Sequence, residues 1–248
     1  MFYAIQWIRS LIYAIQMYVM MFVIGGVGLP FALFNRKAVY FTIHAYCRWV
    51  MWTAGWMVGI KTEIRGTVPD EEILIAAKHQ SFLDVLMIGA ATPRPKFILK
   101  SSLMYMPILA QYAKLTGSVP VNRGRRAEAI RNMVAQVKSG DAPAGQLIIY
   151  PQGTRIAPGV QAPYKVGAAV LYEETGQRCL PVACNVGLFW GRLGIFKKPG
   201  TAVIEFLPMI ESGLSRNEFL ETLEKTIETA SNTLMQEAGF NPNEISRN

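Results

Sequence analysis

The sequence predicts an α/β fold with a mostly parallel central sheet flanked by helices, preceded by an N-terminal two-helix segment. Three observations support this prediction. From about residue 61 onward, short β-type runs alternate with helical patterns. Several of the β-type runs are almost entirely apolar, as in strands that are covered on both faces. The start of the chain contains a long stretch without charge, so we expect a segment over residues 1–60 and an α/β domain over residues 61–248.

The first helix is expected in the uncharged stretch from Ser10 to Asn35. This stretch is long enough to cross a bilayer, because a transmembrane helix needs ~20 residues. It is too long for the apolar core of a signal peptide, so we expect it to remain in the mature protein. A break at Gly25 to Pro30 is expected to end the helix. The alternative is that both N-terminal helices are buried core helices.

The second helix is expected in the apolar stretch over residues 38–60. Arg48 lies near its middle, and inserting a central arginine into the membrane costs ~2.5 to 3.5 kcal/mol. This helix is therefore better suited to lying shallowly in the membrane surface than to crossing the bilayer. Trp7, Trp49, Trp52 and Trp56 also lie in the N-terminal segment, and indole rings favour the headgroup level. We therefore expect the two helices to form a membrane-seating motif in a phospholipid bilayer.

The elements of the α/β part follow from apolar patterns and turn residues. Strands are predicted over residues 71–78, 96–100, 117–122, 146–151, 179–187 and 201–210. Helices are predicted over residues 81–91, 103–115, 125–140 and 167–176. A final helix begins at a capping box formed by Ser215 and Glu218 and stops at Gly239. The sequence contains no repeat, Walker motif or dinucleotide-binding glycine motif.

Charge and the rarer residue types narrow the classes of function. The chain has 25 Lys and Arg against 17 Asp and Glu, and the resulting charge of +8 favours an anionic partner. A nucleic-acid binder is not expected, because no recognition motif occurs. The odd number of cysteines, Cys47, Cys179 and Cys184, argues against a disulfide framework and favours a reducing, cytosol-facing location. With only His44 and His79 in the chain, a zinc site is not expected.

The stretch AAKHQSFLDV, residues 76–85, permits two interpretations. Ser81 and Asp84 can form a capping box at the start of a helix, in which case Asp84 is structural. Alternatively, His79 lies at the carboxyl end of a predicted strand, where open α/β sheets bind ligands. An imidazole that is held by a carboxylate through one nitrogen can accept a proton on the other. This stretch alone does not decide between a helix cap and a general base.

Further polar residues follow other predicted strands. Arg123 comes directly after one strand, Gly153, Thr154 and Arg155 follow another, and Lys165 lies beside a small-residue helix start. Basic side chains and backbone amides at such positions are suited to binding a phosphate. Taken singly, an arginine after a strand is more often a solvated surface charge, and a glycine there can be a simple turn residue. Together with a general base and a membrane-seated start, these residues indicate a reaction on a phospholipid-like substrate at a bilayer surface.

Four sequence blocks, in order, resemble those of the 1-acylglycerol-3-phosphate acyltransferases of the glycerolipid acyltransferase superfamily. The blocks are KHQSFLD at residues 78–84, residues 96–123, which end in an arginine, YPQGTR at residues 150–155 and CLPVA at residues 179–183. The resemblance runs from about residue 60 to residue 210. It implies transfer of a fatty acyl group from a thioester on coenzyme A or acyl carrier protein, without a metal, a cofactor or an acyl-enzyme intermediate.

The resemblance also implies roles for the matching residues. His79 would remove the proton from the acceptor hydroxyl, and Asp84, five positions on in the His-x4-Asp pattern, would orient and polarise it. The phosphate of the acceptor would be held mainly by Arg123 and the Gly-Thr-Arg stretch of the third block. The whole expected substrate-binding set is Lys100, Arg123, Gln152, Gly153, Thr154, Arg155 and Lys165.

Three positions depart from the family pattern. Gln152 stands where glutamate is usual, Lys78 replaces the common asparagine, and residues 100–103, KSSL, lack an acidic residue that is often present. Gln152 keeps the size and the hydrogen-bonding reach of glutamate without its charge, so the sequence leaves open which lysolipid is the acyl acceptor. We expect synthesis of phosphatidic acid from lysophosphatidic acid at the sn-2 hydroxyl, at a bacterial inner membrane with the site facing the cytosol. The alternatives are another lysolipid acceptor and a non-catalytic protein that binds anionic lipid.

Overall fold

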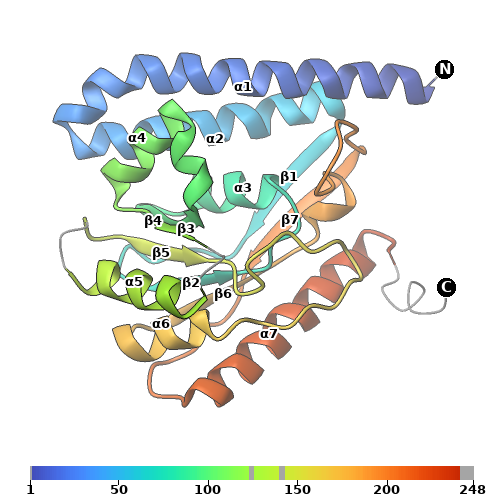
Figure 1. The fold of residues 1–248 in the computed structure, drawn as a ribbon. Helices are drawn as coiled ribbons and strands as arrows, with labels where there is room; N and C mark the ends of the chain where they lie inside the picture. The colour runs from blue at the N-terminus through green and yellow to red at the C-terminus, as the bar shows by residue number, and fades with distance from the viewer. Residues whose placement is uncertain (1, 123–125, 140–142, 241–248) are drawn as a thin grey trace.

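The central sheet matches the predicted fold class. The structure, a computed structural model, describes residues 2–122, 126–139 and 143–240. Within these residues, seven strands form one sheet in the order β1-β7-β6-β2-β5-β3-β4 (Figure 1). Neighbouring strands are parallel except for the antiparallel pair β6 and β7. The strands are β1 (Ile60–Arg65), β2 (Leu74–Ala77), β3 (Pro95–Lys100), β4 (Val119–Val121), β5 (Gln146–Ile149), β6 (Cys179–Cys184) and β7 (Gly200–Phe206).

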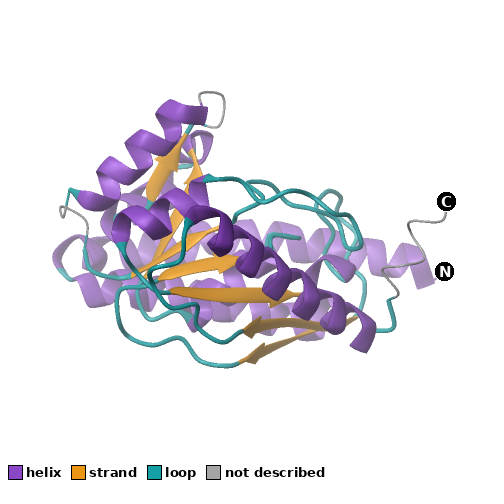
Figure 2. Cartoon of the chain, turned by 90° about the horizontal axis from the view of Figure 1, so that it is seen from below, coloured by secondary structure: helices purple, strands orange, loops and turns teal. Residues whose placement is uncertain are grey.

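Helices cover both faces of this sheet. The upper side in Figure 1 carries α1 (Phe2–Phe34), α2 (Arg36–Val58), α3 (Leu83–Ala91) and α4 (Pro107–Thr116). The lower side carries α5 (Arg126–Lys138), α6 (Gly167–Thr175) and α7 (Arg216–Glu237), which cross the strands in the view from below (Figure 2). Two short 3-10 helices complete the described chain, η1 (Ser101–Tyr105) and η2 (Val186–Leu188). The helices predicted for the α/β part are confirmed with boundaries shifted by a few residues, except that the stretch predicted as one helix over residues 103–115 is divided between η1 and α4.

The apolar strand β2 shows why the core has two layers. Side chains along a strand alternate between its two faces. Ile75 and Ala77 accordingly join the hydrophobic cluster that includes residues of α2 and α3. Leu74 and Ala76 join the cluster that includes residues of α6 and α7. Both faces of β2 are therefore buried, as its continuous apolar sequence predicts.

The first strand, β1, was not predicted from the sequence. Its residues alternate apolar and polar side chains as Ile-Lys-Thr-Glu-Ile-Arg, but they follow the apolar run of α2 with only Gly59 between. Gly59 adopts φ 76°, a left-handed conformation that ends α2 and turns the chain directly into the strand. Because the turn is a single residue, the apolar pattern of the helix runs into that of the strand.

The joint between the two N-terminal helices is the main correction to the predicted fold. A break at Gly25 to Pro30 is wrong, because α1 continues through this stretch and the chain turns at Asn35, whose side chain caps α2. The glycines here allow close packing instead. A Cβ atom added at Gly25 would lie 2.4 Å from Cγ2 of Ile108 on α4, and one at Gly28 would lie 2.3 Å from Oγ1 of Thr42 on α2.

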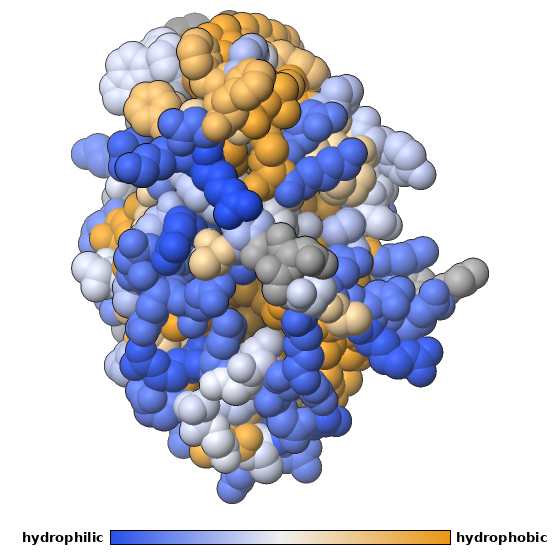
Figure 3. Space-filling view, turned by 90° about the vertical axis from the view of Figure 1, so that its left-hand side faces the viewer, coloured by the Kyte–Doolittle hydropathy of each residue, from blue (hydrophilic) through white to orange (hydrophobic). Residues whose placement is uncertain are grey.

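The first two helices differ in how they pack. Among the described residues, α1 is the helix that is long and apolar enough to cross a membrane, by length and composition. Many of its apolar side chains are exposed, among them Ile8, Ile12 and Phe22. In contrast, α2 contributes to the core beside the sheet with Val50, Ala54 and Val58. The space-filling view shows hydrophobic side chains gathered at the top of one face of the molecule, over the joined ends of these helices (Figure 3).

The loop before β7 ties α1 to the rest of the molecule through Lys197. The backbone nitrogen of Lys197 donates to Oγ of Ser10 at 2.9 Å, and its carbonyl accepts from Nε2 of Gln6 at 2.8 Å. The ammonium lies 4.6 Å from the ring centroid of Trp190 and donates to the carbonyl of Ile195 at 2.8 Å. The residue is 3 % exposed. Burial lowers the pKa of Lys197 to about 8.

The lowered pKa predicts how stability depends on pH. The ordinary pKa of a lysine is 10.5, so between about 8 and 10.5 the unfolded chain binds a proton that the folded protein does not. The contribution of Lys197 to the free energy of unfolding therefore increases as the pH rises through this window. We expect Lys197→Met to remove this contribution, so that the slope of the free energy of unfolding against pH, measured by urea unfolding, is less positive for the variant than for the wild type. Equal slopes for both proteins between pH 8 and 10 would contradict the assignment.

Candidate active site

The polar residues singled out in the sequence follow strands that end at one edge of the sheet. Strands β2, β3, β4, β5 and β6 are mutually parallel along their shared ladder, so their carboxyl ends meet there. His79 follows β2, residues 150–155 follow β5, and Lys100 is the last residue of β3. Arg123, predicted to follow β4, lies outside the described residues. This edge is the position at which open α/β sheets bind ligands.

The alternation of side chains along β2 continues past its last residue, Ala77, so that the next two side chains point in opposite directions. Lys78 points to the lower layer, where its ammonium binds Glu228 of α7 at 2.6 Å. His79 points to the upper layer, where its Nδ1 lies 2.8 Å from Oδ1 of Asp84 on α3. The strand geometry therefore separates the ion pair of Lys78 from the imidazole of its neighbour.

Asp84 holds the imidazole from a fully buried position. Its side chain has an exposed fraction of 0 %, whereas that of His79 is 14 %. The second carboxylate oxygen, Oδ2, accepts backbone hydrogen bonds from Gln80 at 2.9 Å and from Ser81 at 2.7 Å. With the carboxylate ionised, Nδ1 of His79 donates to it. The other ring nitrogen, Nε2, is then the one that can accept a proton.

The two interpretations of residues 76–85 turn out to be compatible. Asp84 accepts a hydrogen bond from the backbone of Ser81, as half of a capping box would require. The other half is replaced: Oγ of Ser81 accepts from the nitrogen of Leu83 at 3.2 Å, and α3 has no side-chain cap at Phe82. One carboxylate thus orders the turn before α3 and orients His79.

Tyr150 is part of this site but was not predicted to be. Its ring stacks on the imidazole of His79, with centroids 4.0 Å apart and an angle of 25° between the planes. Burial, together with the charge of Asp84, raises the pKa of Tyr150 well above its ordinary value, so the phenol stays neutral. The signal in the sequence was its position as the first residue of the third block, one position beyond a buried strand.

The structure brings Gly153 and Lys165 together, as expected for parts of one binding site. Gly153 adopts φ 69°, and a Cβ atom there would lie 2.7 Å from Nζ of Lys165. The backbone nitrogen of Lys165 donates to the carbonyl of Pro151 at 2.9 Å. The left-handed backbone conformation favours glycine at this turn, and the ammonium of Lys165 lies over the open side that the glycine leaves.

The remaining expected binding residues, Thr154, Arg155 and Lys100, make fewer contacts with one another. Arg155 donates through Nη1 to the carbonyl of Arg192 at 3.0 Å and is half-buried, as is Thr154. The backbone nitrogen of Ile156 donates to the carbonyl of His79 at 2.8 Å, which ties the loop after β5 to the loop after β2. Lys100 is exposed at the end of β3. These groups lie on the carboxyl edge of the sheet as predicted, but no contact joins Lys100 to the others among the described residues.

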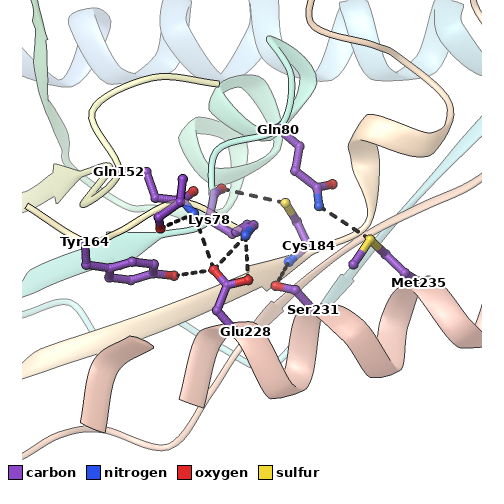
Figure 4. Close-up of polar contacts among 9 residues, drawn as sticks. Lys78, Gln80, Gln152, Tyr164, Cys184, Glu228, Ser231 and Met235 are labelled. Carbon is purple, nitrogen blue, oxygen red and sulfur yellow. Dashed lines mark hydrogen bonds and ion pairs between the residues drawn. The ribbon is translucent and has the colours of Figure 1, made fainter. Parts of the chain in front are cut away.

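Gln152 occupies a different position from the one expected for a substrate-binding residue. It is 3 % exposed, and its Nε2 lies 3.4 Å from the carbonyl of Ala162 and 3.4 Å from Oε1 of Glu228 (Figure 4). Tyr164 donates to the same carboxylate oxygen at 3.0 Å. Sequence reasoning missed Glu228 and Tyr164, because neither lies in one of the four blocks.

Comparison with known proteins settles the family. A family model described as Acyltransferase matches residues 59–185, just over half of the chain. The chain belongs to the acyltransferase family. The matched region contains His79, Asp84 and all four blocks, so the family expected from these blocks is confirmed.

Relatives of this acyltransferase align over most of its length. It is 26% identical over 216 residues to a 1-acyl-sn-glycerol-3-phosphate acyltransferase of Pseudomonas aeruginosa, covering 84% of this chain and 82% of that protein. It is 27% identical over 194 residues to the protein of the same name from Saccharomyces cerevisiae, covering 75% of this chain and 63% of the yeast protein. The chain thus spans less than two thirds of the yeast relative.

A solved structure shares the fold of the acyltransferase. The crystal structure of the 1-acyl-sn-glycerophosphate (LPA) acyltransferase from Thermotoga maritima superposes with a TM-score of 0.79 at 18% sequence identity. The match covers 94% of this chain and 99% of the Thermotoga chain. Because the coverage extends over nearly all of both chains, the similarity includes the N-terminal helices as well as the sheet.

The cysteines of the acyltransferase are poor candidates for a nucleophile. Cys179 and Cys184 are buried in β6, and burial raises the pKa of both thiols. A thiol attacks as its thiolate, so these side chains are unsuited to forming an acyl-enzyme. Among the described residues at this edge of the sheet, the imidazole of His79 is suited to accepting a proton from a hydroxyl.

Proposed function

We propose that this acyltransferase moves a fatty acyl group from a thioester on coenzyme A or acyl carrier protein to the sn-2 hydroxyl of lysophosphatidic acid, which gives phosphatidic acid. The observation that carries the proposal is the His79–Asp84 pair, at 2.8 Å, on the carboxyl edge of the sheet beside the loop of residues 150–155. The names of the relatives from Pseudomonas aeruginosa and yeast support the choice of acceptor.

The proposed mechanism needs one base and an activated donor. Nε2 of His79 removes the proton from the acceptor hydroxyl as its oxygen attacks the thioester carbonyl, and Asp84 stabilises the imidazolium that forms. The tetrahedral intermediate then breaks its carbon–sulfur bond. The thiolate leaves with the proton that His79 had taken, so the reaction is balanced and the imidazole is restored. The thioester supplies the activation, so positioning of the two substrates and a neutralising environment complete the catalysis.

The phosphate of the acceptor is proposed to bind beside the loop that follows β5. The backbone amide of Thr154, the guanidinium of Arg155 and the ammonium of Lys165 are suited to this role. Gly153 shapes the turn, because its own backbone nitrogen donates to the carbonyl of Tyr150 at 2.8 Å. Lys165 already lies close to Gly153. Arg123 and Lys100 are proposed to add positive charge from the ends of the neighbouring strands. Gln152 is proposed to support this loop without contacting the phosphate, because its amide contacts Glu228.

The N-terminal helices are proposed to seat the enzyme on a phospholipid membrane, at the cytosolic side of a bacterial inner membrane. An open apolar groove of about 1040 Å³ lies between the joined ends of α1 and α2, lined among others by Val27, Phe31 and Phe41. Lys37, also at this groove, is suited to the phosphates of the headgroups. Exposed apolar side chains of this kind lose contact with water when they enter a bilayer.

Acyl transfer to a panel of lysolipids tests the proposal. The full chain, in detergent micelles, receives a labelled acyl-coenzyme A or acyl carrier protein and either lysophosphatidic acid, lysophosphatidylcholine, lysophosphatidylglycerol or a lyso-amino-acid lipid. We expect lysophosphatidic acid to be the best acceptor by at least about tenfold, one charge-assisted contact being worth about 1.5 to 3 kcal/mol, because its phosphate monoester is the most exposed and most highly charged.

Two other outcomes have defined meanings. Transfer only to another lysolipid would keep the reaction and change the acceptor, which the glutamine at position 152 makes the second candidate. Absence of transfer to every acceptor with both donors would contradict the enzyme assignment and favour a protein that binds anionic lipid without catalysis.

A further inference from the structure

The two departures from the family pattern that flank the site, Lys78 and Gln152, belong to one cluster on the lower face of the sheet (Figure 4). Its centre is the carboxylate of Glu228, which comes from α7 and lies outside the four sequence blocks. Lys78 donates to both oxygens at 2.6 Å, Tyr164 donates to Oε1 at 3.0 Å and Gln152 donates to Oε1 at 3.4 Å. One carboxylate thus accepts hydrogen bonds from three segments of the chain.

The burial of this cluster makes its charges interdependent. Lys78 and Gln152 are each 3 % exposed and Tyr164 is 8 % exposed, while the side chain of Glu228 is 26 % exposed. A buried ammonium is strongly destabilising unless a carboxylate neutralises it. Burial and the charge of Glu228 raise the pKa of Tyr164, so its hydroxyl stays a neutral donor. Within this cluster, the negative charge that Lys78 requires is supplied by Glu228.

The same geometry explains the glutamine at position 152. Its amide nitrogen faces Oε1 of Glu228 at 3.4 Å. A glutamate at this position would place a second carboxylate against the first, and like charges in such proximity cannot both be ionised without a cost. The neutral amide donates where a carboxylate would repel. The lysine, the glutamine and Glu228 therefore form a compensated set, although Lys78 and Glu228 are 150 positions apart in the sequence.

The cluster also connects the two loops that form the candidate active site. Lys78 directly precedes His79, and Gln152 lies two residues after Tyr150, whose ring stacks on that imidazole. The side chains of Lys78 and Gln152 are anchored on the α7 side of the sheet, whereas His79 and Tyr150 lie on the opposite side. An anchor beneath both loops limits how far the imidazole can move relative to the loop of residues 150–155.

We infer that Glu228 is a positioning residue for acyl transfer, which acts through Lys78 and Gln152 to hold the two active-site loops in register, and that Gln152 is the neutral residue this carboxylate requires. The inference rests on the proposed function for its catalytic part. It assigns the residue at position 152 a role in the placement of the loops, and it predicts that the consequence of a charge there depends on the residue at position 228.

A cycle of charge exchanges tests the inference. Gln152→Glu puts two carboxylates beside Lys78, and Glu228→Gln leaves the ammonium without a carboxylate. We expect each single variant to lose about tenfold or more in kcat with the KM for the thioester donor nearly unchanged, and to unfold at a lower temperature. The double variant, with glutamate at position 152 and glutamine at position 228, exchanges the carboxylate and the amide across the same hydrogen bond. Because the effects of substitutions at residues in contact are coupled, we expect its kcat to recover to within about threefold of the wild type.

The matched control is Glu221→Gln, which removes a glutamate from an exposed position of the same helix. Its kcat and melting temperature are expected to equal those of the wild type. Full kcat in both single variants would overturn the inference, and so would a double variant no better than the worse single one. Recovery of the melting temperature without recovery of kcat would show a structural ion pair only, and would overturn the positioning role.

The thermal cycle also separates this inference from the proposed function. If the wild-type protein transfers no acyl group to any acceptor, the proposed function fails. The melting temperatures of the four proteins still report whether Gln152 and Glu228 compensate one another. If the wild type is active and the double variant is not rescued, the proposed function stands and the inference fails.

Discussion

Replacing His79 with alanine is expected to lower kcat for acyl transfer by about 10² to 10⁴-fold, the usual contribution of a general base. The KM values for donor and acceptor are expected to change little, because the phosphate and the acyl chain are bound by other groups. The melting temperature should stay close to that of the wild type, since the side chain is partly exposed and the two backbone hydrogen bonds from Gln80 and Ser81 to Asp84 remain.

The chain offers a matched control in its other histidine. Nε2 of His44 lies 2.9 Å from the carbonyl of Thr92, which precedes the amino end of β3 at Pro95 and so lies toward the opposite edge of the sheet. The variant His44→Ala is expected to retain its kcat. Steady-state rates on mixed micelles, with unfolding followed in parallel, distinguish the two variants. A His79→Ala protein that is folded and within threefold of the wild-type rate would exclude the imidazole as the base.

Replacing Asp84 with asparagine is expected to have a second large effect, of about 10³ to 10⁴-fold on kcat, by analogy with the loss of the aspartate in a catalytic triad. The carboxylate accepts hydrogen bonds from His79, Gln80 and Ser81. An amide cannot accept all three. Either its NH₂ group faces the imidazole and forces the proton onto Nε2, or it faces the backbone amides and leaves them unpaired in a buried site.

Stability separates this effect from the loss of the base alone. Unlike His79→Ala, the Asp84→Asn variant should also unfold at a lower temperature, because the side chain is fully buried. Ser81→Ala is the matched control: it removes the hydrogen bond from Leu83 to Oγ but keeps the backbone donor to Asp84. Its kcat should be nearly that of the wild type. Equal rates for Asp84→Asn and the wild type would show that Asp84 serves only the turn.

The sequence was sufficient where local patterns control the structure. Almost entirely apolar runs, alternating with helical patterns, predicted the mostly parallel sheet, and the histidine after β2 was correctly placed at the carboxyl edge. The break at Gly25 was wrong because glycine serves both to end helices and to let helices approach, and only the side chain of Ile108 on α4 distinguishes the two. Strand β1 was missed because the turn at Gly59 is a single residue, so the apolar pattern of α2 runs directly into that of the strand.

The part of the site that could not be predicted depends on pairs that are distant in the sequence. The amphipathic pattern of the last helix predicts which side of α7 is buried, but it does not reveal that Glu228 at the border of that side meets Lys78. The stacking of Tyr150 on His79 likewise depends on the adjacency of β2 and β5, which no local pattern specifies. Both contacts follow from the order of the strands.

The way in which α1 is attached determines its direction relative to a bilayer. A helix of 33 residues is ~50 Å long, which exceeds the ~30 Å of a hydrocarbon core. Its buried residues recur from Ser10 to Ala32, nearly end to end, so one side of the helix is fixed along its length to the body of the protein. Standing upright in the membrane would carry Arg48 and the sheet into the hydrocarbon. With the proposed membrane seating, we therefore expect the axis of α1 to run along the membrane plane, so that the enzyme contacts the lipid through the exposed apolar side of this helix.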